Sequence, residues 1–154
     1  MTLSSLNRGI LGLKRADSGA ESHARKAVRV ERRYRVLALD DSELIHAKLR
    51  MLFRSEPSVE ITCTAKWTDV VESCRCEKPP DLLILDLNMP EVRGEIVGMG
   101  VRSSSDAIPI VIFSSESDSR LELAMRTTGA RAAVAKSDGE RLVGEVMNLL
   151  RATC

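Results

Sequence analysis

Five side chains that can do acid, nucleophilic or anion-binding chemistry stand at or just after the ends of short apolar segments. They are Asp40, Asp41, Asp86, Ser114 and Lys136. Three carboxylates brought together repel one another, so either one of them keeps a proton or a cation neutralises them. Ligands that are all oxygen favour a hard cation, and Mg²⁺ commonly shares carboxylates with a phosphate group.

A lysine and a hydroxyl group would complete this chemistry, because phosphoryl oxygens require hydrogen-bond donors. An aspartate can itself attack phosphorus and become an acyl phosphate. Together, the residues predict metal-assisted transfer of a phosphoryl group onto a carboxylate. Each residue alone has a simpler explanation: Asp40 and Asp41 could complement a helix dipole, and Lys136 could be an ordinary surface lysine.

The chain between these residues alternates between strand-like and helix-like patterns. Short apolar segments predict strands at 35–40, 59–63, 81–86, 108–113 and 131–135. Amphipathic stretches predict helices after Ser42, at 68–76, from near Gly94, at 118–128 before Gly129, and at 138–151. Such alternation implies an α/β fold with a parallel sheet covered on both faces. Ligands of these sheets bind beyond the carboxyl ends of the strands, so the polar residues should converge on one site.

Short motifs occur at the strand ends in the order in which the receiver domain of response regulators carries them. They are Leu39-Asp40-Asp41-Ser42, Leu85-Asp86-Leu87-Asn88-Met89-Pro90 followed by Gly94, Ile112-Phe113-Ser114-Ser115, Gly129-Ala130, and Ala135-Lys136-Ser137. The chain resembles this domain of bacterial two-component signalling over residues 35–151. The resemblance implies a flavodoxin-like, doubly wound (βα)5 fold with strand order 2-1-3-4-5.

The resemblance also assigns roles at the site. Asp86 would accept a phosphoryl group from a histidine kinase. Asp41 would bind Mg²⁺ directly, and Asp40 directly or through water. Asp86 and the main-chain carbonyl of Asn88 would complete the protein ligands. A regulator of this kind phosphorylates and slowly dephosphorylates itself, so we do not expect a turnover enzyme.

Ser114 and Lys136 would then contact the phosphoryl oxygens. Two residues depart from the usual pattern of the family. Ala133 stands where the family usually has Tyr or Phe, a ring that turns inward when the hydroxyl group moves. Ser137 follows the lysine where the family favours proline. We therefore expect the phosphorylation chemistry to be retained and the aromatic readout of the switch to be absent.

Charge divides the chain into two parts. Residues 1–35 hold nine lysines and arginines against three acidic residues, whereas residues 36–154 hold 14 against 19. We expect residues 1–33 to be a basic, disordered extension, with a docking element as the alternative, and residues 34–154 to be the receiver domain. No output domain fits after Arg151, so we expect output through contacts with other proteins.

Composition argues against several other functions. Aromatic residues make up 3% of the chain, too few for a stacking platform, and its basic residues form no nucleic-acid motif, so no nucleic-acid partner is expected. No apolar run approaches the ~20 residues of a membrane span, and the first residues lack the compact apolar core of a secretory signal, so neither is expected. The four cysteines lack zinc or redox spacing and indicate free thiols in a reducing cytoplasm. His23 and His46 are expected to be solvated.

The expected partners are a sensor histidine kinase or phosphotransfer protein, which would dock near Leu44 and Ile45, and an unidentified downstream target protein. The target would contact the fourth helix, fifth strand and fifth helix, and a phosphorylation-dependent homodimer is a further expected contact. One alternative is an interaction module that keeps the site as a relic and binds partners equally well without phosphate. Another is a phosphohydrolase, but those enzymes usually carry Asp-x-Asp, whereas Asp40 and Asp41 are adjacent.

Overall fold

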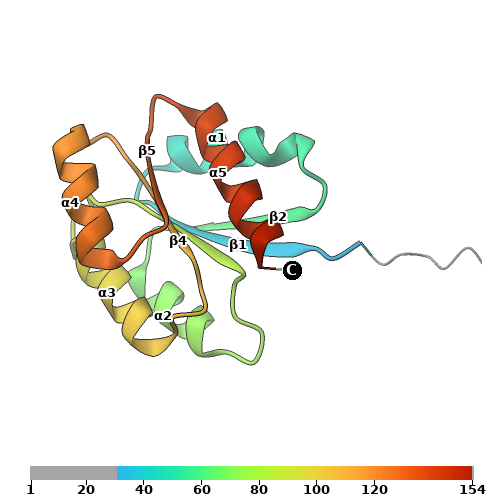
Figure 1. Cartoon of the computed structure of the whole chain (residues 1–154), viewed down its shortest axis with the longest axis horizontal. Helices are drawn as coiled ribbons and strands as arrows, with labels where there is room; N and C mark the ends of the chain where they lie inside the picture. Colours follow the sequence, from blue (N-terminus) through green and yellow to red (C-terminus); the bar gives the residue numbers. More distant parts are fainter. Residues whose placement is uncertain (1–30, 154) are drawn as a thin grey trace, which may run out of the picture. The chain divides into compact units, whose positions relative to one another are not determined.

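The strands form one parallel sheet in the order β2-β1-β3-β4-β5 (Figure 1). A computed structural model describes residues 31–153, so what we predict for residues 1–30 lies outside the described part of the chain. The strands are β1 Tyr34–Leu39, β2 Val59–Thr64, β3 Leu82–Leu85, β4 Ile110–Ser114 and β5 Ala132–Ala135. The predicted strands and the flavodoxin-like strand order are therefore confirmed.

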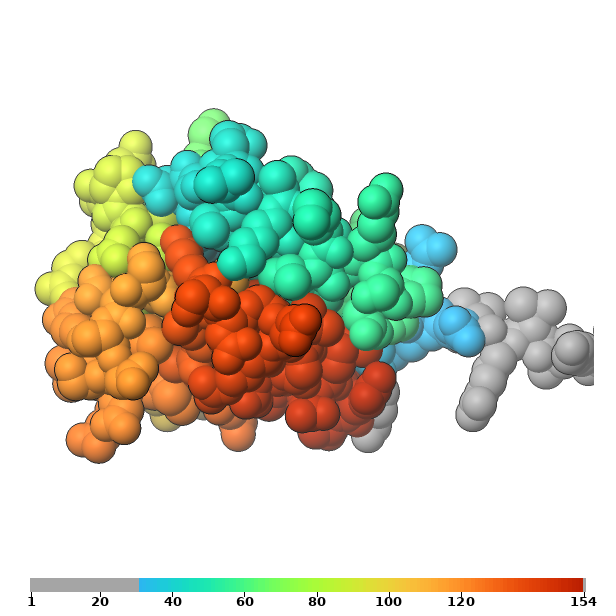
Figure 2. Space-filling view, turned by 90° about the horizontal axis from the view of Figure 1, so that it is seen from above, coloured from blue at the N-terminus to red at the C-terminus, as the bar shows by residue number. Residues whose placement is uncertain are grey.

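Helices cover both faces of the sheet, as the alternating pattern predicts (Figure 1). They are α1 Glu43–Leu52, α2 Trp67–Arg75, α3 Gly94–Ser104, α4 Asp118–Thr128 and α5 Gly139–Ala152, and a short 3₁₀ turn, η1 Phe53–Ser55, follows α1. One core cluster lies between the sheet and α1 and α5, and a second lies between the sheet and α2, α3 and α4. Figure 2 shows the face on which α1 and α5 lie side by side.

The sequence of the central strands explains this layering. Successive side chains of a strand point to opposite faces of the sheet. In β1, Val36 and Ala38 join the core under α1 and α5, whereas Leu37 and Leu39 join the other core. All four residues of β3 are buried, as a strand covered on both faces must be.

The ends of the helices also follow sequence signals. The Ser42 hydroxyl accepts a hydrogen bond from the Ile45 amide at 3.4 Å, so Ser42 is the predicted N-cap of α1. Gly129 has a φ of 70° and ends α4 in the left-handed conformation that glycine adopts at low cost. Within the described residues, no helix is long and apolar enough to cross a membrane.

Candidate functional site

The register of the sheet brings four of the candidate residues to one edge. Leu39 of β1 pairs with Leu85 of β3, so Asp40 and Asp86 leave the sheet side by side. The Asp86 amide donates to the Leu39 carbonyl at 3.0 Å. On the other side, the Lys136 amide donates to the Ser114 carbonyl at 3.0 Å.

The three predicted carboxylates form a cluster at this edge. Asp40, Asp41 and Asp86 each place a carboxylate oxygen within 4.8 Å of the others. Asp40 and Asp86 are each only 2% exposed, whereas Asp41 is exposed. Burying two carboxylates is costly unless a cation neutralises them. The donor set, all oxygen and three carboxylates, fits a hard divalent cation such as Mg²⁺.

Lys136 supplies one positive charge to this cluster. Its ammonium group lies 2.7 Å from Asp40 Oδ2 and 3.2 Å from Asp86 Oδ2. Burial disfavours the charged form of Lys136, but the hydrogen bond and charges of the two aspartates outweigh burial and raise its pKa. One ammonium group faces three carboxylates, so negative charge remains in excess and a cation can still be accommodated.

Burial also shifts the pKa of Asp86. Desolvation raises the pKa of Asp86, and the charge of Asp40 raises it further. Lys136 and the backbone N–H of Asn88 act in the opposite direction without cancelling the rise. The carboxylate form that a nucleophile needs is therefore less favourable here than in a solvated aspartate, and added positive charge would favour it.

Four buried side-chain oxygens have no hydrogen-bond partner within the described residues: Asp40 Oδ2, Asp86 Oδ1, Glu95 Oε2 and the hydroxyl of Ser114. Asp40 Oδ2 is ion-paired with Lys136, whereas Asp86 Oδ1 and the hydroxyl of the fully buried Ser114 side chain face the site without a partner. Buried polar groups almost always find a partner, so such atoms call for a ligand. A carboxylate oxygen and a hydroxyl at one edge match the attacking atom and one donor for a phosphoryl group.

Gly94 holds the backbone after Asp86 in place. A Cβ atom on Gly94 would lie 2.0 Å from the Asp86 carbonyl oxygen and 2.8 Å from Leu87 Cα, so only glycine fits. The Gly94 amide donates to the Leu87 carbonyl at 3.1 Å. Asn88, the predicted source of a carbonyl ligand, is exposed and follows Asp86 by two residues. The role of its carbonyl stays a prediction.

Comparison with known families shows which family has this sequence pattern. Residues 36–147 match the family model described as response regulator receiver domain. The chain belongs to the response regulator receiver domain family. This family is a signalling module of two-component systems and not a turnover enzyme, and its members bind Mg²⁺ at an acidic pocket.

Curated relatives of this receiver domain are longer proteins. It is 31% identical over 102 residues to protein-glutamate methylesterase/protein-glutamine glutaminase 2 of Cereibacter sphaeroides, a match that covers 66% of this chain and 28% of that protein. It is 30% identical over 105 residues to the glycerol metabolism activator of Pseudomonas putida, with 68% and 48% covered. The chain thus spans less than half the length of these two relatives.

Solved structures share the fold. A LuxR-family two-component response regulator from Aurantimonas sp. has a TM-score of 0.70 and 25% identity, with 78% of this chain and 86% of that chain covered. A CheY-like receiver domain protein from Methanospirillum hungatei has a TM-score of 0.70 and 15% identity, with 79% and 96% covered. The second likeness supports the fold alone.

Two α1 residues of this receiver domain contact the site without having been predicted there. His46 is 4% exposed, and its Nε2 lies 2.6 Å from the Asp40 carbonyl oxygen, so the expectation that His46 is solvated is wrong. Lys48 Nζ donates to the Lys136 carbonyl at 2.5 Å. Residues 46, 49 and 53 are buried at helical spacing, a pattern that could have indicated the burial of His46.

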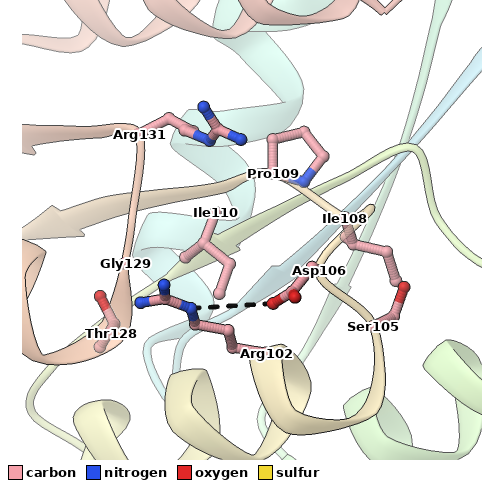
Figure 3. Close-up of a pocket in the computed structure, with 9 residues that line it drawn as sticks. All are labelled: Arg102, Ser105, Asp106, Ile108, Pro109, Ile110, Thr128, Gly129 and Arg131. Carbon is pink, nitrogen blue, oxygen red and sulfur yellow. Dashed lines mark ion pairs between the residues drawn. The ribbon is translucent and has the colours of Figure 1, made fainter.

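The receiver domain also has a pocket of about 370 Å³ at the opposite edge of the sheet (Figure 3). Arg102, from the last turn of α3, lies 3.8 Å from Asp106 in this pocket, and Arg131 enters it from the start of β5. None of the predicted site residues lines it. The acidic cluster, not this pocket, is therefore the candidate site.

Ala133 and Ser137 are the two residues that depart from the usual pattern of the receiver family, and both lie close to the site in the sequence of β5 and the residues after it. Ala133 is half-buried on β5 and lines a pocket of about 350 Å³ with residues of α4 and α5, among them Leu121 and Met125. The resemblance predicts an aromatic ring at this position, and the alanine side chain leaves the hollow open. The described residues contain no cis peptide bond, so the bond between Lys136 and Ser137 is trans.

Proposed function

We propose that this receiver domain accepts a phosphoryl group on Asp86. The donor is the phosphohistidine of a sensor histidine kinase or of a phosphotransfer protein. The observation that supports this most directly is the buried Asp86 Oδ1, which has no partner in the described structure and lies at the same edge as Ser114 and Lys136. A carboxylate oxygen without a partner at that position is free to attack phosphorus.

Each residue has a distinct task in the transfer. An Asp86 oxygen forms a bond to phosphorus while the bond from phosphorus to the donor histidine nitrogen breaks. That nitrogen keeps the electron pair and takes up a proton from solvent. Lys136 and Ser114 donate hydrogen bonds to the phosphoryl oxygens, and these donors are in place before the reaction.

A divalent cation completes the charge balance of the site. Asp40, Asp41, Asp86 and the main-chain carbonyl of Asn88 would hold Mg²⁺, which would neutralise the carboxylates and the transferred group. Because burial raises the pKa of Asp86, the same positive charge would favour its reactive, ionised form.

Output is proposed to occur through protein contacts on α4, β5 and α5, including a phosphorylation-dependent homodimer. With Ala133 on β5, the inward turn of an aromatic ring cannot report the phosphorylated state. The free cysteines described, Cys63, Cys74 and Cys76, are consistent with a reducing compartment, and we propose a cytoplasmic location on that ground.

The test is phosphorylation by a small donor. Wild-type protein and Asp86→Ala are incubated with acetyl phosphate and Mg²⁺, and the intact mass is measured. We expect one added phosphoryl group on the wild type only. Binding of beryllofluoride together with Mg²⁺, measured by isothermal titration calorimetry, gives a second readout. An unmodified wild type, or equal modification of the variant, would refute the proposal.

A further inference from the structure

Helix α1 contacts the main chain of the site on two sides. On one side, Lys48 Nζ donates to the Lys136 carbonyl at 2.5 Å and also lies 5.9 Å from the centroid of the Phe113 ring. Phe113 directly precedes Ser114, so one lysine of α1 contacts the main chain of Lys136 and the neighbour of Ser114. The contact joins residues 88 positions apart in the sequence.

On the other side, His46 binds the main chain of Asp40. Its Nε2 is 2.6 Å from the Asp40 carbonyl oxygen. A carbonyl can only accept, so Nε2 carries the hydrogen atom in this contact. The His46 side chain is 5% exposed, and water therefore cannot easily replace it as the donor.

Both carbonyls lie beyond the ends of their strands. The amides of Asp40 and Lys136 are bonded to the neighbouring strands, to Thr64 and Ser114, but their carbonyls have left the ladder. Lys48 and His46 supply the missing donors from one helix. The same two site residues are joined through their side chains, since Lys136 Nζ is 2.7 Å from Asp40 Oδ2.

We propose that Lys48 and His46 are positioning residues, which fix the main chain at the two ends of the Lys136–Asp40 ion pair. Lys48 sets where the Lys136 ammonium group meets the phosphoryl oxygens. His46 sets where the Asp40 carboxylate meets the cation. This inference rests on the proposed function and adds two residues that act through others.

Substitution of Lys48 should change the rate of phosphorylation, whereas substitution of His46 should change the affinity for Mg²⁺. Lys48→Met keeps an unbranched side chain over Phe113 but removes the donor. It should slow phosphorylation by acetyl phosphate about tenfold, because small misplacements of reacting groups reduce rates strongly. Mg²⁺ affinity, measured by isothermal titration calorimetry, should stay at the wild-type value, because the carboxylates are untouched.

His46→Leu should instead weaken Mg²⁺ affinity about tenfold, as the loss of groups that orient metal ligands commonly does. The conservative variants separate positioning from packing. Lys48→Arg and His46→Gln each keep an N–H donor and should restore most of the lost rate or affinity. Arg50→Met, on the exposed side of α1, removes a charge without touching the site and should match the wild type.

Circular dichroism and urea unfolding show whether each variant is folded. The proposal is overturned if Lys48→Met reacts at the wild-type rate, or if His46→Leu binds Mg²⁺ as well as His46→Gln does. A wild type that binds Mg²⁺ but takes up no phosphoryl group would refute the proposed function instead. The Mg²⁺ titrations of the His46 variants would still test the positioning of Asp40 in that case.

Discussion

At both edges of the sheet, charged residues complement the helix dipoles, but the two edges differ in whether their buried polar groups have partners. We call the edge where the carboxyl ends of the strands lie the carboxyl edge, and the opposite one the amino edge. Each described α-helix has an acidic residue in its first turn, at the carboxyl edge, and an arginine in its last turn, at the amino edge. These charges complement the helix dipoles at both edges. They therefore do not explain why only one edge has the candidate site.

The difference lies in burial. At the carboxyl edge, Asp40 and Asp86 are buried, and Asp86 Oδ1 and Ser114 Oγ have no partner among the described residues. At the amino edge, Asp106 is 87% exposed and pairs with Arg102 at 3.8 Å, an arrangement that costs little and contributes little. Unfavourable burial is thus concentrated where a cation and a phosphoryl group would relieve it.

The two ends of β5 offer the strongest test of this contrast. Lys136 follows the strand at the carboxyl edge, and Arg131 precedes it at the amino edge. Lys136→Met should slow phosphorylation by acetyl phosphate by on the order of a hundredfold, because a preorganised donor to the phosphoryl group is lost. Arg131→Met should stay within about twofold of the wild type, as surface substitutions usually do. Similar rates for the two variants would remove the functional difference between the edges.

Two glycines at opposite edges allow a second comparison. A Cβ on Gly94 would meet the backbone of Asp86 and Leu87, which cannot move without displacing the site. Gly94→Ala should lower the free energy of unfolding by about 3 kcal/mol, as overpacking does, and should also slow phosphorylation. Both effects are measurable, by urea unfolding and by intact mass over time.

Gly129→Ala is the matched control for Gly94→Ala. Its Cβ would meet the far end of the Arg102 side chain, which can move away, so the main cost is the φ of 70°. We expect a loss of about 1 kcal/mol for a left-handed alanine, with phosphorylation unchanged. If Gly129→Ala slowed phosphorylation as much as Gly94→Ala, the effect could not be assigned to the Asp86 backbone.

The same contrast explains how much the sequence could predict. Apolar segments that end in Asp40, Asp86 and Lys136 indicate both the strands and the edge where their carboxyl ends meet, because parallel strands place those ends together. Ser42 and Gly129 indicate helix ends because the hydrogen bond or backbone conformation that each provides involves only residues close to it in the sequence.

Contacts between segments that are distant in the sequence could not be predicted from it. Lys48 looks like any lysine on an amphipathic helix, and its partner is the carbonyl of a residue 88 positions away. His46 looks solvated until helix α1 is placed against the sheet. Main-chain acceptors carry no sequence signature, so positioning residues of this kind emerge only from the packed structure.

The burial of Asp86 can also be tested through stability alone. Burial raises the pKa of Asp86 above its ordinary value of 3.8, so the folded protein holds this proton more tightly than the unfolded chain. The folded state then binds more protons, and the free energy of unfolding falls as pH rises from that ordinary value through the raised one. Asp86→Asn removes the buried charge and should stabilise the metal-free protein at neutral pH by about 1 to 2 kcal/mol.

Urea unfolding in EDTA across this pH range measures the gain, which should be absent below the ordinary pKa and grow as Asp86 ionises. Mg²⁺ should shrink the gain, because it binds the folded wild type more tightly than the variant. Asp106→Asn is the control at the amino edge, where an exposed carboxylate has little to gain from neutralisation. If both variants gained equally, the stabilisation would reflect the net charge of the domain, and the burial of Asp86 would not distinguish the two edges.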